Sequence, residues 1–412
     1  GRMSIQDISI EAQTTEGLAT TPRTLRQRLL QRLVGCAKTG QLSIVWPDGS
    51  RWQHVGGTPG PHAELRLRRD QAVTRLALGG DTGFAESYMD GDWDSPDLLQ
   101  LLAFGAANLE PMDSVFAAKL VNAVWNRMQH ALRANTLKGS RRNIAFHYDL
   151  GNEFYGNWLD RTMSYSAALF SERDHDLAAA QDAKYRRLAD AVCLAPESRV
   201  LEVGCGWGGF AEIAIRDYGS DVVGLTLSAE QQKFAQKRLQ SAGLGAHADI
   251  RLQDYRDVRG LFDAVVSIEM FEAIGEENWP TYFQKLRSVL RPGGKAGIQV
   301  ITINDDRYEA YRERPDFIQK YIFPGGMLPS PERFEKAAAE TGFEIADRFF
   351  FGESYAETLR RWHEQFEAQW PAIEKLGFDE RFRRMWRYYL AYCEAGFRDG
   401  AINVAQYTLT RS

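Results

Sequence analysis

The alternation of hydrophobic and polar positions changes in character along the chain. Residues 24–35 ("TLRQRLLQRLVG") carry apolar residues at helical spacing and predict a helix. The short apolar runs "LSIVW", "AELRLRR" and "AVTRLAL" predict strands between Gly and Pro turns, and "DTGFAESYMDGDWDSPDLLQLLAFGA" returns to a helical pattern. These segments predict a small α+β domain over residues 23–125, preceded by a polar, disordered tail over residues 1–22.

From residue 180 onward, helical and strand-like segments alternate. The series begins with a helix over residues 179–193 and continues with strand "SRVLEVGCG", helix "FAEIAIRDY", strand "DVVGLTL", helix "SAEQQKFAQKRLQSAG", strand "ADIRLQD", strand "FDAVVSI" and helix "WPTYFQKLRSVL", with another strand after "RPGGKAGIQVITI". Repeated βα units predict an α/β fold with a doubly wound, mostly parallel sheet. We place this fold in a second domain over residues 146–412, reached through a helical linker over residues 126–145.

The composition narrows the class of protein. Hydrophobic residues make up 44% and charged residues 25% of the 412 positions, which is typical of a folded chain. The net charge of −5 disfavours nucleic acid as a partner. The four cysteines (Cys36, Cys193, Cys205 and Cys393) lie far apart, so we expect no metal, no disulfide framework and a cytoplasmic location. We see neither a signal peptide nor an apolar run long enough to span a membrane.

A glycine-rich turn follows the first strand of the alternating region. In "VLEVGCGWGGF" (residues 200–210), Gly204, Gly206 and Gly208 let the backbone turn tightly and approach a ligand closely. A lone G-x-G also fits a dinucleotide site, so the context decides. Glu202 precedes the loop on the strand, where a carboxylate can face the ligand, and Cys205 is expected to pack.

The next two strands end in polar residues that face the same crevice. "GLTLSAEQ" supplies Thr226, Ser228 and Gln231, and "LQDYRD" supplies Asp254, which can accept a hydrogen bond from an adenine amine. The combination resembles the cofactor site of class I S-adenosylmethionine-dependent methyltransferases. The alternative is a glycine turn that only packs a strand against a helix.

Longer motifs extend the resemblance well beyond the cofactor loop. "HYDLGNEFYGNWLD", "MSYSAALF", "LEVGCGWGGFA", "VVGLTLSAEQ", "VSIEMFEAIG", "YIFPGGMLPS" and "SYAETLRRW" together resemble the cyclopropane-fatty-acid synthase family, which includes the mycolic acid cyclopropane synthases. "GFAESYMDGDWDSPDLLQLL" resembles the N-terminal domain of its phospholipid-modifying members. The resemblance implies a Rossmann-like methyltransferase sheet, methylation of an acyl double bond in a membrane phospholipid, and a homodimer.

The resemblance also implies roles for single residues. Tyr165 and Ser166 touch the methionine end of S-adenosylmethionine, while Gly204 and Gly206 approach it from the first loop. The residues from Thr226 to Gln231 approach from the second loop, and Tyr255 and Arg256 match the adenine-side pair. Trp207 either touches the cofactor or caps the loop, and His147 is expected to be structural.

In the family, a bicarbonate ion takes the proton that must leave after methyl transfer. Glu272, Tyr355 and the backbone of Ile301 match ligands of that ion. The match makes Glu272 the functional carboxylate of "SIEMFEAIG" and leaves Glu269 as a structural neighbour.

The remaining ligands of that ion are replaced in this chain. Ala167 stands where a Cys is expected, Gln299 stands where the bacterial enzymes have His, and Ala273 replaces a further His. The seven histidines, at positions 54, 62, 130, 147, 175, 247 and 363, supply no substitute.

Two products follow from this altered site. If bicarbonate still binds through Glu272, Gln299 and Tyr355, a cyclopropane ring forms. If the anion site is lost or altered, the cation loses a proton without closing a ring, with Glu272 or Tyr355 as the nearest base. We favour the second outcome, a methyl-branched unsaturated chain such as a diene that precedes a furan fatty acid. Two competing hypotheses are a methyltransferase that acts on a soluble alkene and a lipid-binding protein with a relic cofactor site.

A lipid substrate predicts peripheral binding at the inner face of the cytoplasmic membrane. Cations gather at Arg66, Arg68 and Arg69, and at Arg133, Lys138, Arg141 and Arg142. "RFRRMWRYYLAY" (residues 381–392) mixes cations and aromatic residues at helical spacing, which suits a membrane interface, although a solvated helix face is the commoner explanation.

Overall fold

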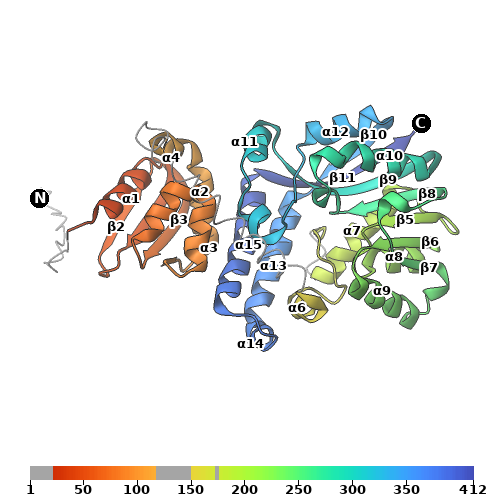
Figure 1. The fold of residues 1–412 in the computed structure, drawn as a ribbon, viewed down its shortest axis with the longest axis horizontal. Coiled ribbons are helices and arrows are strands. Elements are labelled where there is room, and N and C mark those ends of the chain that lie inside the picture. The colour runs from red at the N-terminus through yellow and green to blue at the C-terminus, as the bar shows by residue number, and fades with distance from the viewer. Residues whose placement is uncertain (1–21, 117–149, 172–175) are drawn as a thin grey trace, which may run out of the picture.

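The computed structural model describes residues 22–116, 150–171 and 176–412. Its larger part is built on a seven-stranded sheet with the strand order β10-β11-β9-β8-β5-β6-β7 (Figure 1). The strands are β5 (Arg199–Val203), β6 (Asp221–Thr226), β7 (Ala248–Leu252), β8 (Phe262–Ile268), β9 (Leu290–Ile303), β10 (Phe343–Phe350) and β11 (Ile402–Arg411). The five neighbouring strands β9, β8, β5, β6 and β7 pair in parallel, whereas β11 pairs antiparallel with both β9 and β10. The predicted α/β fold with a mostly parallel sheet is confirmed.

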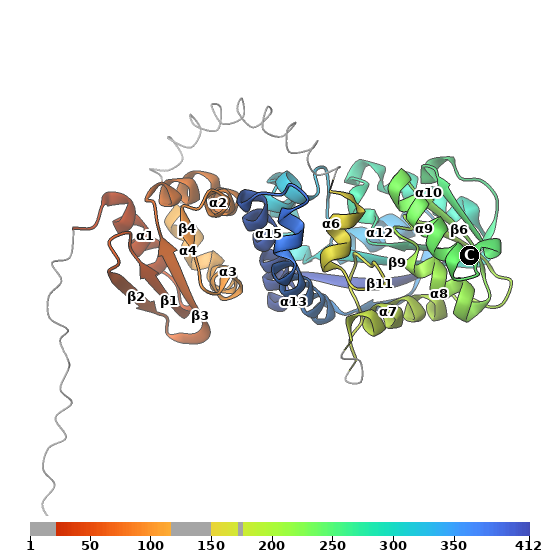
Figure 2. The same cartoon turned by 90° about the horizontal axis from the view of Figure 1, so that it is seen from below.

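Helices cover both faces of this sheet (Figure 2). On one face, α7 (Leu177–Ala191), α8 (Gly209–Tyr218) and α9 (Ala229–Ser241) share a core with Val200 and Val222. On the other, α10 (Trp279–Val289) and α12 (Pro331–Glu340) share a core with Leu201 and Val223. Successive side chains of a strand point to opposite faces, so strands covered on both sides read as unbroken apolar runs in the sequence.

The N-terminal part is a separate four-stranded sheet in the order β2-β1-β3-β4. Its elements are α1 (Leu25–Gly35), β1 (Thr39–Val45), β2 (Arg51–Val55), β3 (Thr58–Leu67), α2 (Gln71–Met89), β4 (Trp93–Asp94), α3 (Leu98–Ala107) and α4 (Leu109–Phe116). The strand predicted at "AVTRLAL" is wrong, because this segment lies in α2, where Ala72, Val73 and Leu76 face the core at helical spacing. Strand β2 went unpredicted because it is a largely exposed edge strand without a buried apolar face.

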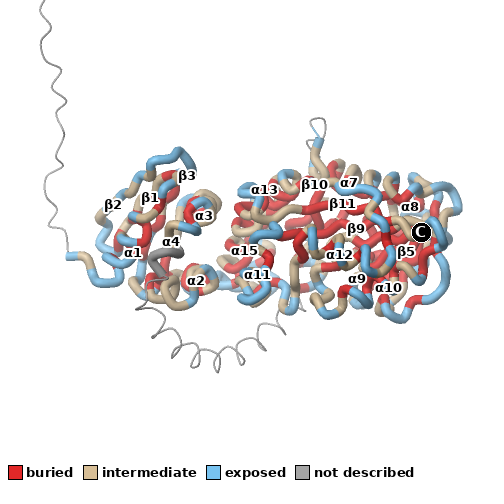
Figure 3. The backbone as a smooth tube through the Cα atoms, turned by 90° about the horizontal axis from the view of Figure 1, so that it is seen from above, coloured by how far each residue is buried: buried red, intermediate tan, exposed pale blue. Residues whose placement is uncertain are grey.

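Two long helices, α13 (Gly352–Ala368) and α15 (Glu380–Asp399), stand between the two sheets (Figures 1 and 2). Trp386 and Tyr388 of α15 belong to the same buried core as Trp93 of the N-terminal part (Figure 3). Arg384 donates hydrogen bonds to the carbonyls of Tyr88, at 2.5 Å, and Trp93, at 2.8 Å. The N-terminal part therefore shares a continuous core with the larger part.

This packing corrects the interface predicted for "RFRRMWRYYLAY". The segment lies in α15, and its aromatic residues are buried, except Tyr392, which is partly buried. Its cations are held by carboxylates, because Arg381 pairs with Asp90, and both Arg383 and Arg387 pair with Glu367. The mixture of cations and aromatic rings serves internal packing. Arg66, Arg68 and Arg69 likewise form ion pairs, with Glu64, Asp94 and Asp92 respectively.

Several predicted features lie outside the described residues. They are the tail up to residue 21, the linker over residues 126–145, His147, and the cations Arg133, Lys138, Arg141 and Arg142. Among the helices that the structure does describe, none has the length and apolarity needed to cross a bilayer.

Candidate active site

The glycine loop joins the carboxyl end of β5 to the start of α8. Gly204, Gly206 and Gly208 all have left-handed backbones, with φ values of +80°, +54° and +92°. A Cβ on Gly204 would lie 3.1 Å from Met270 Cγ, and one on Gly208 would lie 3.1 Å from Ala235 Cβ, so both glycines are also required by packing. A Cβ on Gly206 would meet no atom within 4 Å. Gly206 therefore presents open backbone at the edge where a parallel sheet binds its ligand.

Glu202 lies on β5 just before this loop and is 3% exposed. Its Oε1 has no hydrogen-bond partner among the described residues. Burial raises the pKa of Glu202 to about 8, and the buried ammonium of Lys184 opposes that shift. An unpartnered, buried carboxylate oxygen beside an open glycine suits the hydroxyl groups of a nucleoside. The two features fit S-adenosylmethionine.

The residues predicted at the second strand end form a hydrogen-bonded cap on α9. The Thr226 hydroxyl donates to Gln231 Oε1 at 2.9 Å and accepts from the Ser228 amide at 3.1 Å. Ser228 Oγ accepts from the Gln231 amide at 3.2 Å and caps the helix. The predicted set is thus brought together and held rigid, at the carboxyl end of the strand next to β5.

The predicted adenine-side residues lie in a short helical turn, Tyr255–Asp257. Both carboxylate oxygens of Asp254 accept from Arg256, at 3.0 Å from Nε and 2.7 Å from Nη2. These hydrogen bonds lower the pKa of Asp254, so it is an ionised acceptor. Tyr255 is buried and packs edge-on against Tyr282 at 5.7 Å.

Aromatic side chains continue from the glycine loop into the larger part of the chain. Trp207 lies 5.2 Å from Tyr155 of α6 (Gly151–Trp158), and Tyr155 lies 5.2 Å from Tyr165. Tyr165 stacks on Trp362 of α13 at 5.5 Å, with an interplanar angle of 4°. Trp362 meets Tyr355 edge-on at 6.1 Å. These rings form a continuous row of contacts from the glycine loop to Tyr355, and aromatic ring faces stabilise positive charge.

At the Tyr355 end of this row of rings, the carboxylate of Glu269 accepts hydrogen bonds from three donors. Its Oε2 accepts from the Ala167 amide at 2.8 Å and from Gln299 Nε2 at 2.7 Å. Its Oε1 accepts from the Tyr355 hydroxyl at 2.5 Å. Gln299 and Tyr355, two of the residues predicted to bind an external anion, therefore converge on a side chain of the protein itself, together with the amide of Ala167, which stands at the position of the missing Cys ligand. The sequence led us to expect a structural, hydrogen-bonding carboxylate at Glu269, but not that it accepts from Gln299 and Tyr355, which were predicted to hold an external anion.

Glu272 makes only one of the contacts predicted for it. Its Oε1 accepts from the Ile301 amide at 2.5 Å, and its Oε2 has no partner among the described residues. The predicted pairing with Ile301 is thus present, whereas Tyr355 and Gln299 donate to Glu269 instead.

The two carboxyl groups differ in electrostatic setting. Burial raises the pKa of Glu269, but Lys184, Tyr355 and the other two donors act in the opposite direction and favour its charged form. Burial, followed by the neighbouring Glu269, raises the pKa of Glu272 to about 8. Since close carboxyl groups do not both ionise readily, we assign the charge to Glu269 and the proton to Glu272.

Lys184 is a buried cation close to the predicted site residues that the sequence did not reveal. It lies on α7, is fully buried and donates to Ser166 Oγ at 2.5 Å. Burial lowers the pKa of its ammonium to about 8, and Glu269, Asp160 and Glu202 counteract this. The sequence pattern of the predicted helix over residues 179–193 did not indicate that Lys184 faces the protein interior.

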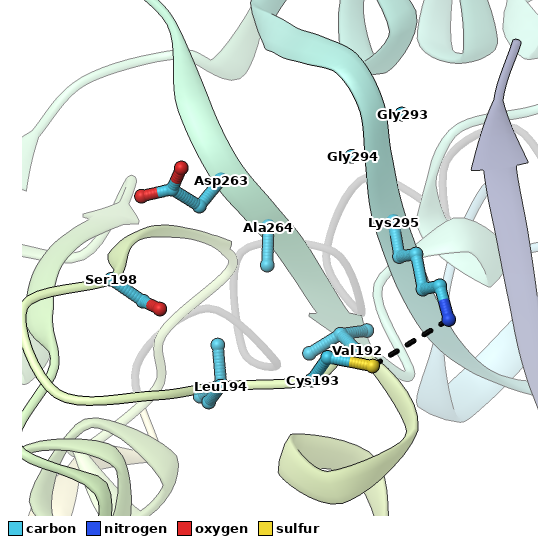
Figure 4. Close-up of a pocket in the computed structure, with 9 residues that line it drawn as sticks. All are labelled: Val192, Cys193, Leu194, Ser198, Asp263, Ala264, Gly293, Gly294 and Lys295. Carbon is cyan, nitrogen blue, oxygen red and sulfur yellow. Dashed lines mark hydrogen bonds between the residues drawn. The ribbon is translucent and has the colours of Figure 1, made fainter.

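A cavity of about 150 Å³ lies at the opposite edge of the sheet (Figure 4). It is lined by Ser198, Asp263 and the Lys295 side chain, whose Nζ lies 3.5 Å from Cys193 Sγ. Ser198 and Asp263 stand at the amino ends of β5 and β8, away from the glycine loop. None of the predicted site residues lines this cavity. Cys205, in the glycine loop, is buried as predicted.

Known proteins share this architecture. The family model described as mycolic acid cyclopropane synthetase matches residues 135–407. The chain is 40% identical over 408 residues to the tuberculostearic acid methyltransferase UfaA1 of Mycobacterium tuberculosis, covering 96% of this chain and 92% of that protein. It is 37% identical over 358 residues to the cyclopropane-fatty-acyl-phospholipid synthase of Escherichia coli, covering 85% and 88%.

Solved structures agree with these similarities. The cyclopropane synthase MmaA2 of Mycobacterium tuberculosis superposes with a TM-score of 0.61 at 31% identity, over 66% of this chain and 98% of that one. The mycolic acid cyclopropane synthase CmaA1, complexed with SAH and CTAB, gives the same TM-score and coverage. The larger part of the chain thus has the fold of these methyltransferases.

Proposed function

This chain belongs to the mycolic acid cyclopropane synthetase family of S-adenosylmethionine-dependent lipid methyltransferases, and we propose that it methylates a double bond in an unsaturated acyl chain of a membrane phospholipid. The observation that carries the proposal is the line of aromatic rings from Trp207, in the glycine loop, to Tyr355, beside Glu269. An alkene carbon that attacks an electrophilic methyl group leaves a cation on the chain. Ring faces and a nearby carboxylate are groups that stabilise such a cation.

The cofactor side of the site is supplied by residues already described. S-adenosylmethionine, when bound, supplies the electrophilic methyl group. Glu202 would accept from its nucleoside hydroxyls, Gly204 and Gly206 would lie against it, and Tyr165 and Ser166 would border its methionine end. The rigid cap of Thr226, Ser228 and Gln231, and the turn of Asp254, Tyr255 and Arg256, would enclose the remainder.

We further propose that the product is a methyl-branched unsaturated chain, such as a diene that precedes a furan fatty acid. Two observations support this over a cyclopropane ring. Ala167 and Gln299 replace two side-chain ligands expected for bicarbonate, and the Ala167 amide, Gln299 and Tyr355 already donate to Glu269. The relative that matches 96% of the chain is named for a methyltransferase activity, whereas the Escherichia coli relative is named for a cyclopropane product.

The site of action follows from the substrate. Phospholipid chains require the protein to work at a membrane, so we propose peripheral binding at the inner face of the cytoplasmic membrane, as a homodimer. The predicted cation cluster of Arg66, Arg68 and Arg69 is ion-paired, so the acyl substrate itself is the main argument for this location. Co-sedimentation with phosphatidylglycerol vesicles at low salt tests it, and a protein that stays in the supernatant would refute it.

The product test compares phospholipid vesicles carrying either isolated cis or conjugated double bonds. Vesicles, protein and S-adenosylmethionine are incubated in carbon dioxide-free buffer with and without added bicarbonate. A branched alkene and a cyclopropane are isomers, so the extracted chains are analysed by proton NMR and by mass spectrometry after mild hydrogenation, which reduces only the alkene. We expect a branched alkene whose yield is independent of bicarbonate. A bicarbonate-dependent ring product would overturn the product proposal.

A further inference from the structure

We propose that Glu269 is a built-in anion that replaces an external base, and that its carboxylate accepts the proton released after methyl transfer. This inference rests on the proposed function and adds to it the identity of the base. It assigns the proton to the carboxylate that sequence reasoning had set aside, in place of Glu272 or Tyr355.

The first argument is the placement of the donors. A backbone amide, a side-chain amide and a phenol approach one carboxylate from three separate segments, at 2.5 to 2.8 Å. Such a convergence is the arrangement by which proteins hold a bound carboxylate or bicarbonate ion. Gln299 is itself fixed, because its Oε1 accepts from Gln406 Nε2 at 3.1 Å. The donors therefore form a preorganised anion pocket, filled by the protein's own side chain.

The second argument is the conformation of Glu269. Its φ of +51° lies in the left-handed region, which a side chain other than glycine adopts only at a cost of about 1–2 kcal/mol. The strain persists because its amide donates to the Gln299 carbonyl at 2.7 Å, while its carboxylate holds the three donors. Glu269 is thus held at this position by surrounding contacts rather than by its own backbone preference.

The third argument is that Glu269 lies close to both the cofactor loop and the row of aromatic rings. The next residue, Met270, packs against Gly204 of the cofactor loop, and Tyr355 joins Glu269 to the ring of Trp362. Glu272 is not available as the base, because burial and the neighbouring Glu269 keep its carboxyl group protonated, and only one amide donates to it. Glu269 therefore supplies the ionised carboxylate that contacts the row of aromatic rings, through Tyr355.

The chemical step balances without another reactant. Methyl transfer forms a carbon–carbon bond, breaks the sulfur–methyl bond and leaves a cation on the acyl chain. A C–H bond on a carbon adjacent to the cation then breaks. Its electrons form the new carbon–carbon double bond, and the proton passes to a carboxylate oxygen of Glu269. The carboxyl group releases the proton to water when the product leaves.

The experiment removes the carboxylate and offers an external one. Glu269→Gly suits the left-handed backbone and opens the donor pocket, while Glu269→Gln keeps the side-chain size but cannot accept the proton as a carboxylate. Glu197→Gly is the matched control, because Glu197 has a similar φ of +67° and is exposed in the turn before β5. Turnover and melting temperature are measured in sodium bicarbonate and in sodium chloride, at equal pH and ionic strength.

We expect both Glu269 variants to lose about 100-fold or more in turnover without bicarbonate, with cofactor affinity retained. Bicarbonate should raise both the turnover and the melting temperature of Glu269→Gly, but of neither Glu269→Gln nor Glu197→Gly. Full activity of Glu269→Gly without bicarbonate, or bicarbonate dependence of the wild type, would overturn the inference. If no phospholipid supports turnover, the proposed function fails, while the melting-temperature comparison still decides whether Glu269 fills an anion pocket.

Discussion

The cofactor loop and the carboxylate cluster lie at the same edge of the sheet, yet they are built in opposite ways. The loop comes from one continuous segment, and its key property is the backbone freedom of Gly204, Gly206 and Gly208. The cluster joins Glu269, after β8, to residues of β9, of α13 and of the segment between α6 and α7. A site made of backbone shape can be encoded locally, whereas a site made of converging side chains exists only after the chain has folded.

The same difference decides how each region tolerates change. The loop fails if a side chain fills the space that its glycines leave open. The cluster depends on matched donors and acceptors, since a buried carboxylate that loses a donor keeps the full cost of its burial. Substitutions of the two regions should therefore separate cofactor binding from proton transfer.

The largest effect is expected for Gly206→Val. The added side chain would enter the open space beside Gly206 and would strain a backbone at φ +54°. We expect affinity for S-adenosylhomocysteine, measured by calorimetry, to fall on the order of 100-fold or more, because the close approach of ligand to backbone is lost.

Gly243→Val is the matched control for that substitution. Gly243 follows α9 and has a φ of +74°, and a Cβ added there would also meet no atom within 4 Å. The substitution should lower stability by a similar strain of about 1–2 kcal/mol without changing cofactor affinity. Equal losses of affinity in the two variants would remove the distinction between strain and a blocked cofactor site.

An intermediate effect is expected for Tyr355→Phe, which removes one donor from Glu269 and leaves the cofactor loop intact. The lost hydrogen bond should reduce turnover on the order of tenfold. The Tyr355 hydroxyl lowers the pKa of Glu269, so its removal raises that pKa. Because the ionised carboxylate is the active form, the rise of turnover with pH should move to higher pH. The measurement is the pH profile of turnover at saturating cofactor.

Tyr407→Phe provides the control for the pH profile. The Tyr407 hydroxyl donates to Glu335 Oε2 at 3.0 Å, so the same kind of hydrogen bond is lost elsewhere. Tyr407 points to the sheet face opposite Gln406, which contacts Gln299. An identical shift of the profile in both variants would show that Tyr355 acts through general stability alone.

The smallest effect concerns Glu202 and the stability of the cofactor-free protein. Its pKa of about 8 lies above that of an exposed glutamate, near 4.3. Between these values the folded state binds more protons than the unfolded state, so the free energy of unfolding falls as pH rises. Glu202→Gln should remove up to about 1.4 kcal/mol per pH unit from that slope. Denaturant unfolding between pH 5 and pH 8 (roughly the window set by these two pKa values) measures it, and an unchanged slope would contradict the neutral, buried state of Glu202.

Much of the fold was predictable because its signals are local. The apolar runs of β5, β6 and β8 and the helices between them were identified from their patterns, as was the glycine loop. The segment of α2 at "AVTRLAL" was mistaken for a strand, because a short run of apolar residues fits both periods. The aromatic segment of α15 was interpreted as either a membrane interface or a solvated helix face, because its sequence does not show that the N-terminal part packs against it.

The site was predicted only in part. Tyr355 and Gln299 were correctly grouped, and they donate to Glu269 together with the Ala167 amide, but the sequence did not indicate that this acceptor is a side chain of the protein. Glu269 and Glu272 are three positions apart, and nothing in "SIEMFEAIG" indicates which carboxylate meets which donors. The left-handed backbone at Glu269 turns its side chain to the donors, and that conformation arises from the tertiary contacts.

The sequence by itself determined the parallel sheet, the glycine loop and the membership of a methyltransferase family, because period, turn chemistry and contiguous motifs are properties of neighbouring residues. Only the tertiary structure decided that Lys184 turns inward, that α13 and α15 join the two sheets in one core, and that Glu269 occupies the donor pocket. These features depend on residues from separate elements meeting in space, as Glu269 and Tyr355 do at a separation of 86 positions. Their energies come from burial and from matched hydrogen bonds, which no local pattern records.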